Sequence, residues 1–233
     1  MNKTNIEWCE YTWNPVVGCK RGCTYCYAKK INDRFNKTPF SEMIFHEKRL
    51  NEPIKLNTPA IIFCGSMSDI EYWKEDWIDK ITDICLKARK HTFMFLSKST
   101  YSYEKLYRLF PENTMQGLTL TQCNSDKEKE SQRFHSLAYS RPFLSIEPIL
   151  GRFELKLDAA HFLEKIIVGA MTGKKPVEPK TEWIESVINC FPEDKIFWKS
   201  NIKTSRAFIE IFGKNYIGQH THGCKPQAAS TML

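Results

Sequence analysis

The sequence has 233 residues, of which 42% are hydrophobic and 26% are charged, a balance that excludes a disordered or fibrous protein. No apolar run reaches the roughly 20 residues of a membrane-spanning helix, and the segment 1–10 lacks a signal-peptide pattern, so we expect a cytoplasmic protein without membrane contact. The net charge of +7 permits an anionic partner such as nucleic acid, although the scattered basic residues equally fit an ordinary solvated surface.

Short apolar runs alternate with amphipathic stretches along the chain. Strands are predicted at 60–64, 92–96, 115–120, 143–146, 165–168 and 195–198, with a seventh near 13–18 that Pro15 weakens. Helices are predicted between them at 27–35, 77–90, 103–109, 125–138 and 181–190. This alternation indicates an α/β fold with parallel strands in one domain, and six or seven units suit a partial (β/α)6-type barrel.

Polar residues follow most of the predicted strands. The carboxyl ends of parallel strands form the active face of such folds, so we expect these residues to converge. They are Ser66, Ser68, Asp69, Lys98, Thr119, Thr121, Glu147 and Lys199. Any one of these positions also suits a capping or turn residue.

Three cysteines lie in one short loop. Residues 18–28 read G-C-K-R-G-C-T-Y-C-Y-A and give Cys19, Cys23 and Cys26 the spacing C-x3-C-x2-C. Thiolates are the usual ligands of iron-sulfur clusters, and three of them can hold three irons of a [4Fe-4S] cluster while the fourth iron stays open. The alternative is a structural zinc site, in which Cys9 would be the fourth ligand.

The cysteine loop resembles the signature of the radical S-adenosylmethionine (SAM) superfamily, in which an aromatic residue, here Tyr25, usually precedes the last cysteine. The segments 5–19, 65–69, 145–150 and 167–173 resemble the phage Gp37/Gp68-like family, and radical SAM proteins of mobile elements look similar. The resemblance implies a radical SAM barrel over residues 1–217, followed by a disordered tail at 218–233.

The resemblance also implies the activity. SAM would chelate the open iron, and an electron from a donor such as flavodoxin or ferredoxin would cleave it to a 5'-deoxyadenosyl radical, which abstracts hydrogen from a substrate. The leading substrate class is nucleic acid, followed by a protein or peptide, and a partner protein encoded nearby would complete the site equally well. The rival interpretation is a nucleic-acid-binding module that a cluster or zinc ion only stabilises.

Ser66, Ser68 and Asp69 match the place at which radical SAM enzymes bind the amino group of SAM, which needs hydrogen-bond acceptors. Asp69 is the best single candidate, although it equally suits the cap of the following helix.

The other SAM contacts are assigned to later strand ends. Lys98 would pair with the SAM carboxylate, Thr119 and Thr121 would reach the ribose hydroxyls, and Gly169 would allow close approach of the adenine. A tight turn at 168–173 would use the same glycine.

Glu147 and Lys199 are the candidate catalytic residues for the substrate, and the alternative is a structural ion pair. Near the C-terminus, His220, His222 and Cys224 are candidates for a second metal site, against a disordered tail.

Overall fold

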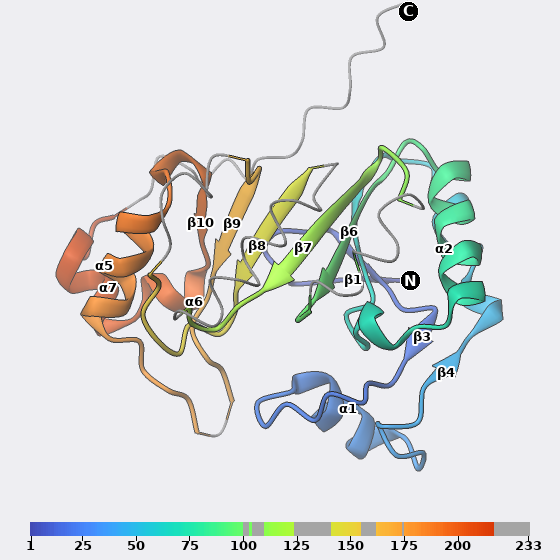
Figure 1. Cartoon of the computed structure of the whole chain (residues 1–233), viewed down its shortest axis with the longest axis horizontal. Helices are drawn as coiled ribbons and strands as arrows, with labels where there is room; N and C mark the ends of the chain where they lie inside the picture. The colour runs from blue at the N-terminus through green and yellow to red at the C-terminus, as the bar shows by residue number, and fades with distance from the viewer. Residues whose placement is uncertain (100–102, 104–109, 124–140, 155–161, 174, 217–233) are drawn as a thin grey trace, which may run out of the picture. The chain divides into compact units, whose positions relative to one another are not determined.

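The computed structural model describes residues 1–99, 103, 110–123, 141–154, 162–173 and 175–216 (Figure 1). Within these residues the chain forms two compact units, one up to residue 116 and one from residue 117 onward. The predicted tail at 218–233 lies outside the described residues. None of the described helices has both the length and the apolar composition that a membrane crossing requires.

The first unit contains a mostly parallel sheet. Its strands follow the order β1, β2, β5, β6, and then the start of β7. The bounds are β1 Asn2–Lys3, β2 Tyr11–Trp13, β5 Ile61–Cys64, β6 Thr92–Ser97 and β7 Thr114–Thr119. Strands β2, β5 and β6 are parallel, with Trp13 opposite Cys64 and Cys64 opposite Phe95. A separate antiparallel pair joins β3 (Val16–Val17) to β4 (Ile44–Phe45).

Among the residues that the structure describes, the first unit contains the α-helices α1 (Tyr27–Phe35) and α2 (Glu75–Lys87). Acidic residues in the first turn and Lys87 in the last turn of α2 match the helix dipole. Ile78, Ile81, Ile84 and Cys85 form its buried face and belong to the same core cluster as the β-strands. The described part of the unit also contains the 3₁₀-helices η1 (Glu47–Arg49), η2 (Pro53–Lys55) and η3 (Ile70–Tyr72).

The second unit places the end of β7 beside three parallel strands, β8 (Pro142–Ile146), β9 (Lys165–Val168) and β10 (Ile196–Trp198). These strands end level with one another, since Ile146 pairs with Val168 and Val168 pairs with Trp198. The unit also contains η6 (Glu193–Lys195) and the helices α5 (Thr181–Cys190), α6 (Ser200–Lys203) and α7 (Arg206–Phe212).

The predicted mixed α/β class with mostly parallel strands is confirmed, whereas the closed arrangement of a partial barrel stays a prediction. All six predicted strands form, and the helices at 27–35 and 181–190 have the predicted bounds. The seventh predicted strand is two strands, β2 and β3, which are separated at Pro15. The helix predicted at 125–138 lies outside the described residues, as does most of the one at 103–109.

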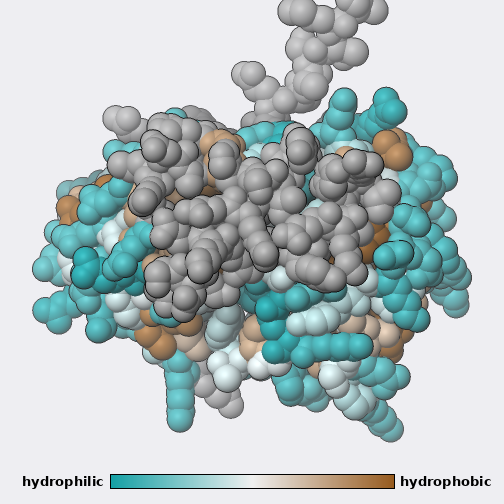
Figure 2. Space-filling view, in the orientation of Figure 1, coloured by the Kyte–Doolittle hydropathy of each residue, from teal (hydrophilic) through white to brown (hydrophobic). Residues whose placement is uncertain are grey.

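Hydrophilic side chains predominate where Figure 2 shows the described residues. Helix α1 is an exception, because Tyr27, Ile31 and Phe35 follow one another at four-residue spacing and are 51%, 44% and 71% exposed. These residues therefore form an apolar stripe directly after the cysteines.

Candidate functional site

The cysteine loop, residues 18–26, connects β3 to α1 in the first unit. Its start is fixed by two backbone hydrogen bonds, from Gly18 N to the Met67 carbonyl (3.0 Å) and from Cys19 N to the Phe40 carbonyl (2.7 Å). Gly18 has a φ of +110°, and a Cβ at this position would lie 2.5 Å from the Glu42 carbonyl oxygen. Only glycine therefore fits where the loop begins.

Polar groups lie beside each of the three loop cysteines. The backbone N–H of Arg21 lies beside the Cys19 thiol, and the Tyr25 hydroxyl lies beside Cys23. Cys26 is the N-cap of α1, where its Sγ accepts a 3.3 Å hydrogen bond from Lys29 N.

The surroundings of the thiols also change the pKa values of the residues beside them. Burial, followed by the nearby Cys23, raises the pKa of Tyr25 to about 12, so its hydroxyl remains a donor at neutral pH. Burial raises the pKa of Cys19, and the hydrogen bond from Arg21 opposes this shift. The Lys98 ammonium lies 5.3 Å from the centre of the Tyr25 ring. Burial lowers the pKa of Lys98, whereas the nearby Cys23 raises it.

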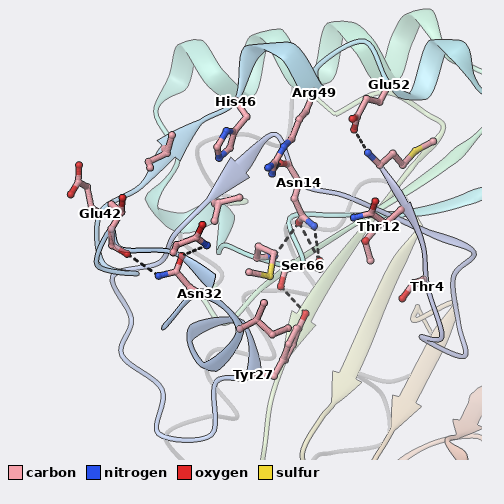
Figure 3. Close-up of a pocket in the computed structure, with 18 of the residues that line it drawn as sticks. Thr4, Thr12, Asn14, Tyr27, Asn32, Glu42, His46, Arg49, Glu52 and Ser66 are labelled. Carbon is pink, nitrogen blue, oxygen red and sulfur yellow. Dashed lines mark hydrogen bonds and ion pairs between the residues drawn. The ribbon is translucent and has the colours of Figure 1, made fainter. Parts of the chain in front are cut away.

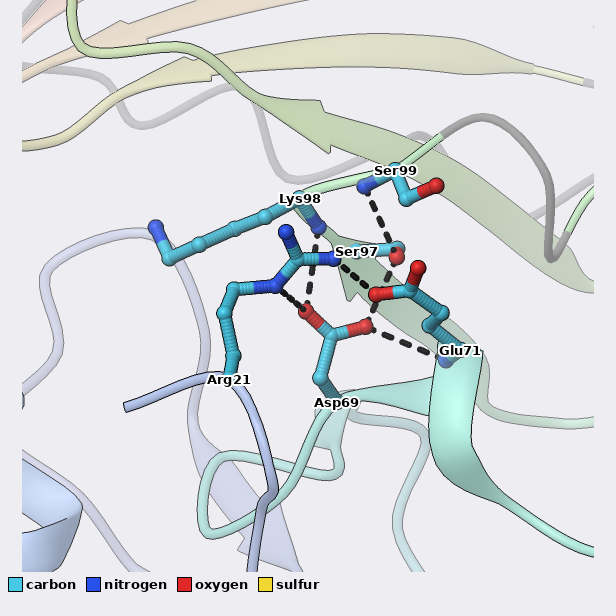
Figure 4. A network of polar contacts seen from close by, with 6 residues as sticks. All are labelled: Arg21, Asp69, Glu71, Ser97, Lys98 and Ser99. Atoms are coloured by element: carbon cyan, nitrogen blue, oxygen red, sulfur yellow. Dashed lines mark hydrogen bonds and ion pairs between the residues drawn. The ribbon is translucent and has the colours of Figure 1, made fainter. Parts of the chain in front are cut away.

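Asp69 connects the cysteine loop to the ends of two strands (Figure 4). It is 6% exposed, and its Oδ1 accepts hydrogen bonds from Ser97 Oγ (2.7 Å) and Glu71 N (3.1 Å). Its Oδ2 accepts one from Lys98 N (3.1 Å) and lies 3.4 Å from Arg21 Nε. Arg21 also forms an ion pair with Glu71. The network, Arg21, Asp69, Glu71, Ser97 and Lys98, thus joins the loop to the segments after β5 and β6.

The structure brings together three of the residues predicted to bind SAM, namely Tyr25, Asp69 and Lys98. The hydroxyls of the other two in this unit make structural contacts: Ser66 Oγ hydrogen-bonds with the Asn14 amide, and Ser68 Oγ accepts a 3.0 Å hydrogen bond from Trp73 Nε1. Asp69 also caps η3 through Glu71 N, so the alternative of a capping role is confirmed.

Sequence reasoning missed Arg21 and Glu71, the ion pair that holds the middle of the loop. Two features of the sequence could have indicated this pair: Arg21 is a cation between the first two cysteines, and Glu71 is an acid two residues after Asp69. Among the described residues, no group of three or more His, Cys, Asp or Glu side chains is placed to hold a single metal ion. A [4Fe-4S] cluster does not require its cysteines to meet at a single ion, because each thiolate binds a different iron atom.

The second unit gathers three of the predicted residues at the ends of its parallel strands. Glu147 follows β8, Gly169 follows β9 and Lys199 follows β10, and Lys199 Nζ lies 2.6 Å from Glu147 Oε1. A Cβ on Gly169 would lie 2.8 Å from the same Glu147 oxygen, so the glycine leaves room for the pair. Thr119 ends β7, and the Thr121 carbonyl accepts a hydrogen bond from Leu150 N.

The ion pair in the second unit can be tested by a double-mutant cycle. We expect Glu147→Gln and Lys199→Met each to lower the free energy of unfolding, because the side chains are only 22% and 19% exposed. The double variant should recover about 0.5–3 kcal/mol relative to additivity in urea titrations. Additive losses would show that the two side chains do not stabilise one another.

His220, His222 and Cys224 lie outside the described residues.

No solved structure matches the chain. The sequence is 24% identical over 224 residues to "Uncharacterized protein MJ0683" of Methanocaldococcus jannaschii, and the match covers 93% of this chain and 80% of that protein. A family model described as "Protein of unknown function (DUF5131)" matches residues 3–223, so the chain belongs to the DUF5131 family.

Proposed function

We propose that the protein is a radical SAM enzyme whose Cys19, Cys23 and Cys26 hold a [4Fe-4S] cluster. The observation that carries this proposal is that three partly exposed thiols lie close to one another on one loop, in which Cys26 accepts a hydrogen bond from Lys29 N and Arg21 pairs with Asp69. Hydrogen bonds to cysteine sulfur are one of the means by which proteins tune such clusters. Cys64 and Cys85 differ from the loop cysteines in being buried in the core, and burial raises their pKa well above the usual value.

The three cysteine ligands fit a [4Fe-4S] cluster. All three cysteines are partly exposed, whereas Cys9 is buried at 8% exposure. The loop contributes sulfur ligands alone, which suits iron-sulfur chemistry. When bound, the cluster and SAM would supply a radical that abstracts a hydrogen atom from substrate.

The residues around the loop have distinct tasks in this proposal. Lys98 offers a half-buried ammonium to the SAM carboxylate, and Asp69 fixes the Lys98 backbone through its 3.1 Å hydrogen bond. Arg21, bound to Asp69 and Glu71, holds the middle of the loop. Thr119, Thr121 and Gly169 are proposed for the ribose and adenine.

The proposal extends to the partners and the fold. It includes a partial radical SAM barrel, a cytosolic electron donor such as flavodoxin or ferredoxin, and Glu147 and Lys199 as substrate contacts. The net charge of +7 favours a nucleic-acid substrate over a protein.

Anaerobic reconstitution tests the proposal. We expect the purified protein to bind about four irons and about four sulfides per chain and, once reduced, to convert SAM to 5'-deoxyadenosine and methionine. Elemental analysis, spectroscopy of the reduced state and chromatography of the products measure this. Stoichiometric zinc without iron, together with salt-sensitive nucleic-acid binding that SAM does not affect, would favour the binding module instead.

A further inference from the structure

A cavity of about 640 Å³ lies within the first unit, between α1, β2, β3 and the segment 38–52 (Figure 3). Its volume is in the range of small-molecule sites. Part of its wall is apolar, formed by side chains that include Val17, Ile31 and Ile44. None of the loop cysteines lines it, and of the residues predicted to contact SAM only Ser66 does, whose hydroxyl is bound to Asn14.

Two basic side chains, His46 and Arg49, lie next to one another on this cavity (Figure 3). They are three residues apart across the 3₁₀-helix η1, in which residues i and i+3 eclipse one another. The turn is anchored to the strands, since His46 N donates to the Pro15 carbonyl (2.7 Å) and Trp13 Nε1 donates to the Arg49 carbonyl (2.8 Å). The pair is therefore held in place before any ligand arrives.

The Arg49 guanidinium is half-buried and its charge is not balanced. In the described part of the chain it forms no ion pair, and its one hydrogen bond runs from Nη1 to the Asn14 carbonyl (3.1 Å). Two carboxylates line the cavity, but Glu52 pairs with the Met1 amino group and Glu42 lies well apart from Arg49 (Figure 3). A partly desolvated cation of this kind is stabilised by an anion that enters beside it.

We propose that this cavity binds a small organic anion, with its carboxylate or phosphate on Arg49 and His46 and its apolar body against Val17, Ile31 and Ile44. This site goes beyond the proposed radical chemistry and needs neither cluster nor SAM. Both ligand chemistries present oxygen acceptors to the same donors, and Arg49 can bind either through two N–H groups.

Protonation of His46 is coupled to this binding. Burial, and then the charge of Arg49, lower the pKa of His46 in the free protein. A bound anion offsets the repulsion from Arg49 and favours the imidazolium, so proton uptake accompanies binding. The other charged groups on the cavity are Glu42 and the Glu52–Met1 pair. Affinity for an anion of fixed charge should consequently fall as the pH rises from about 6 to about 8.

Calorimetric titration of the full chain without cluster tests the site. Benzoate, phenyl phosphate and inorganic phosphate are the three ligands, and we expect at least one aryl anion to bind more tightly than inorganic phosphate. Arg49→Gln should weaken that binding by about tenfold or more. Lys48→Gln is the matched control, because it removes the same charge from an exposed position of the same turn and should change nothing.

A second variant keeps the test decisive if Arg49→Gln does not fold. Within the described residues the His46 side chain makes no hydrogen bond, so His46→Gln should fold normally, bind benzoate several-fold more weakly and lose the pH dependence. Failure of all three anions to bind would overturn the proposal. Binding that is equal in the wild type and in the variants at Arg49 and His46 would overturn it as well, whatever the outcome of cluster reconstitution.

Discussion

Replacement of Cys19, Cys23 or Cys26 by alanine is expected to abolish cluster assembly and with it SAM cleavage. Changes to residues that merely hydrogen-bond a metal ligand already cost about 10-fold to 100-fold, so loss of a ligand itself should exceed about a hundredfold in SAM turnover. Iron and sulfide content after anaerobic reconstitution, and 5'-deoxyadenosine formed per chain, are the measurements. A variant that retains full iron and turnover would show that its cysteine is not a ligand.

Two control variants separate ligand loss from misfolding. Cys26→Ser keeps an oxygen that can accept from Lys29 N, and serine is a favourable N-cap, so α1 should persist while the thiolate is lost. Cys9→Ala removes a buried cysteine outside the loop and should leave iron content unchanged. If Cys26→Ser assembles the cluster as well as the wild type does, the spacing of three cysteines is not the binding motif.

The strands were predictable because their apolar runs are bounded by polar turns, as at 60–64 and 165–168. The short strands β1 and β4 have two residues each and carry no periodic signal, so no sequence pattern indicates them. The break between β2 and β3 has a local cause, since Pro15 lacks the N–H that a continuous strand would use.

The candidate site was only partly predictable. The spacing of Cys19, Cys23 and Cys26 is local information, and so is the position of Tyr25 between two of them. The ion pair between Arg21 and Glu71 joins residues 50 positions apart, and it depends on how β5 aligns beside β2. Pairs of this kind arise from tertiary structure, which the one-dimensional pattern does not contain.

The same distinction applies to Arg49. His46 stands three residues before it in the sequence. The hydrogen bond from Trp13 that anchors the turn, however, joins residues that are 36 positions apart. The sequence of the segment 46–49 alone fits an exposed basic loop as well as it fits a turn beside a cavity. The cavity was therefore visible only once the strands and α1 were in place.

Asp69→Ala is expected to destabilise the first unit strongly. The carboxylate accepts from Ser97, Glu71 and Lys98 and pairs with Arg21, so its removal leaves several donors without their acceptor and Arg21 with one of its two carboxylates. Removing one member of a buried ion pair costs about 3–5 kcal/mol. Urea titration of the protein without cluster measures the loss. Asp83→Ala, an exposed acid on α2, is the control and should cost less than about 1 kcal/mol.

The double variant Arg21→Met with Asp69→Asn shows where the loss originates. If the contact between Arg21 and Asp69 contributes most of the cost, the double variant should lose less stability than the sum of the losses of Arg21→Met and Asp69→Asn, because each single change already removes that contact. If the Ser97 and Lys98 hydrogen bonds dominate, the double variant should be no more stable than the single one. A normal unfolding free energy for Asp69→Ala, combined with lost SAM affinity in the reconstituted protein, would contradict the structural role and leave Asp69 solely as a SAM ligand.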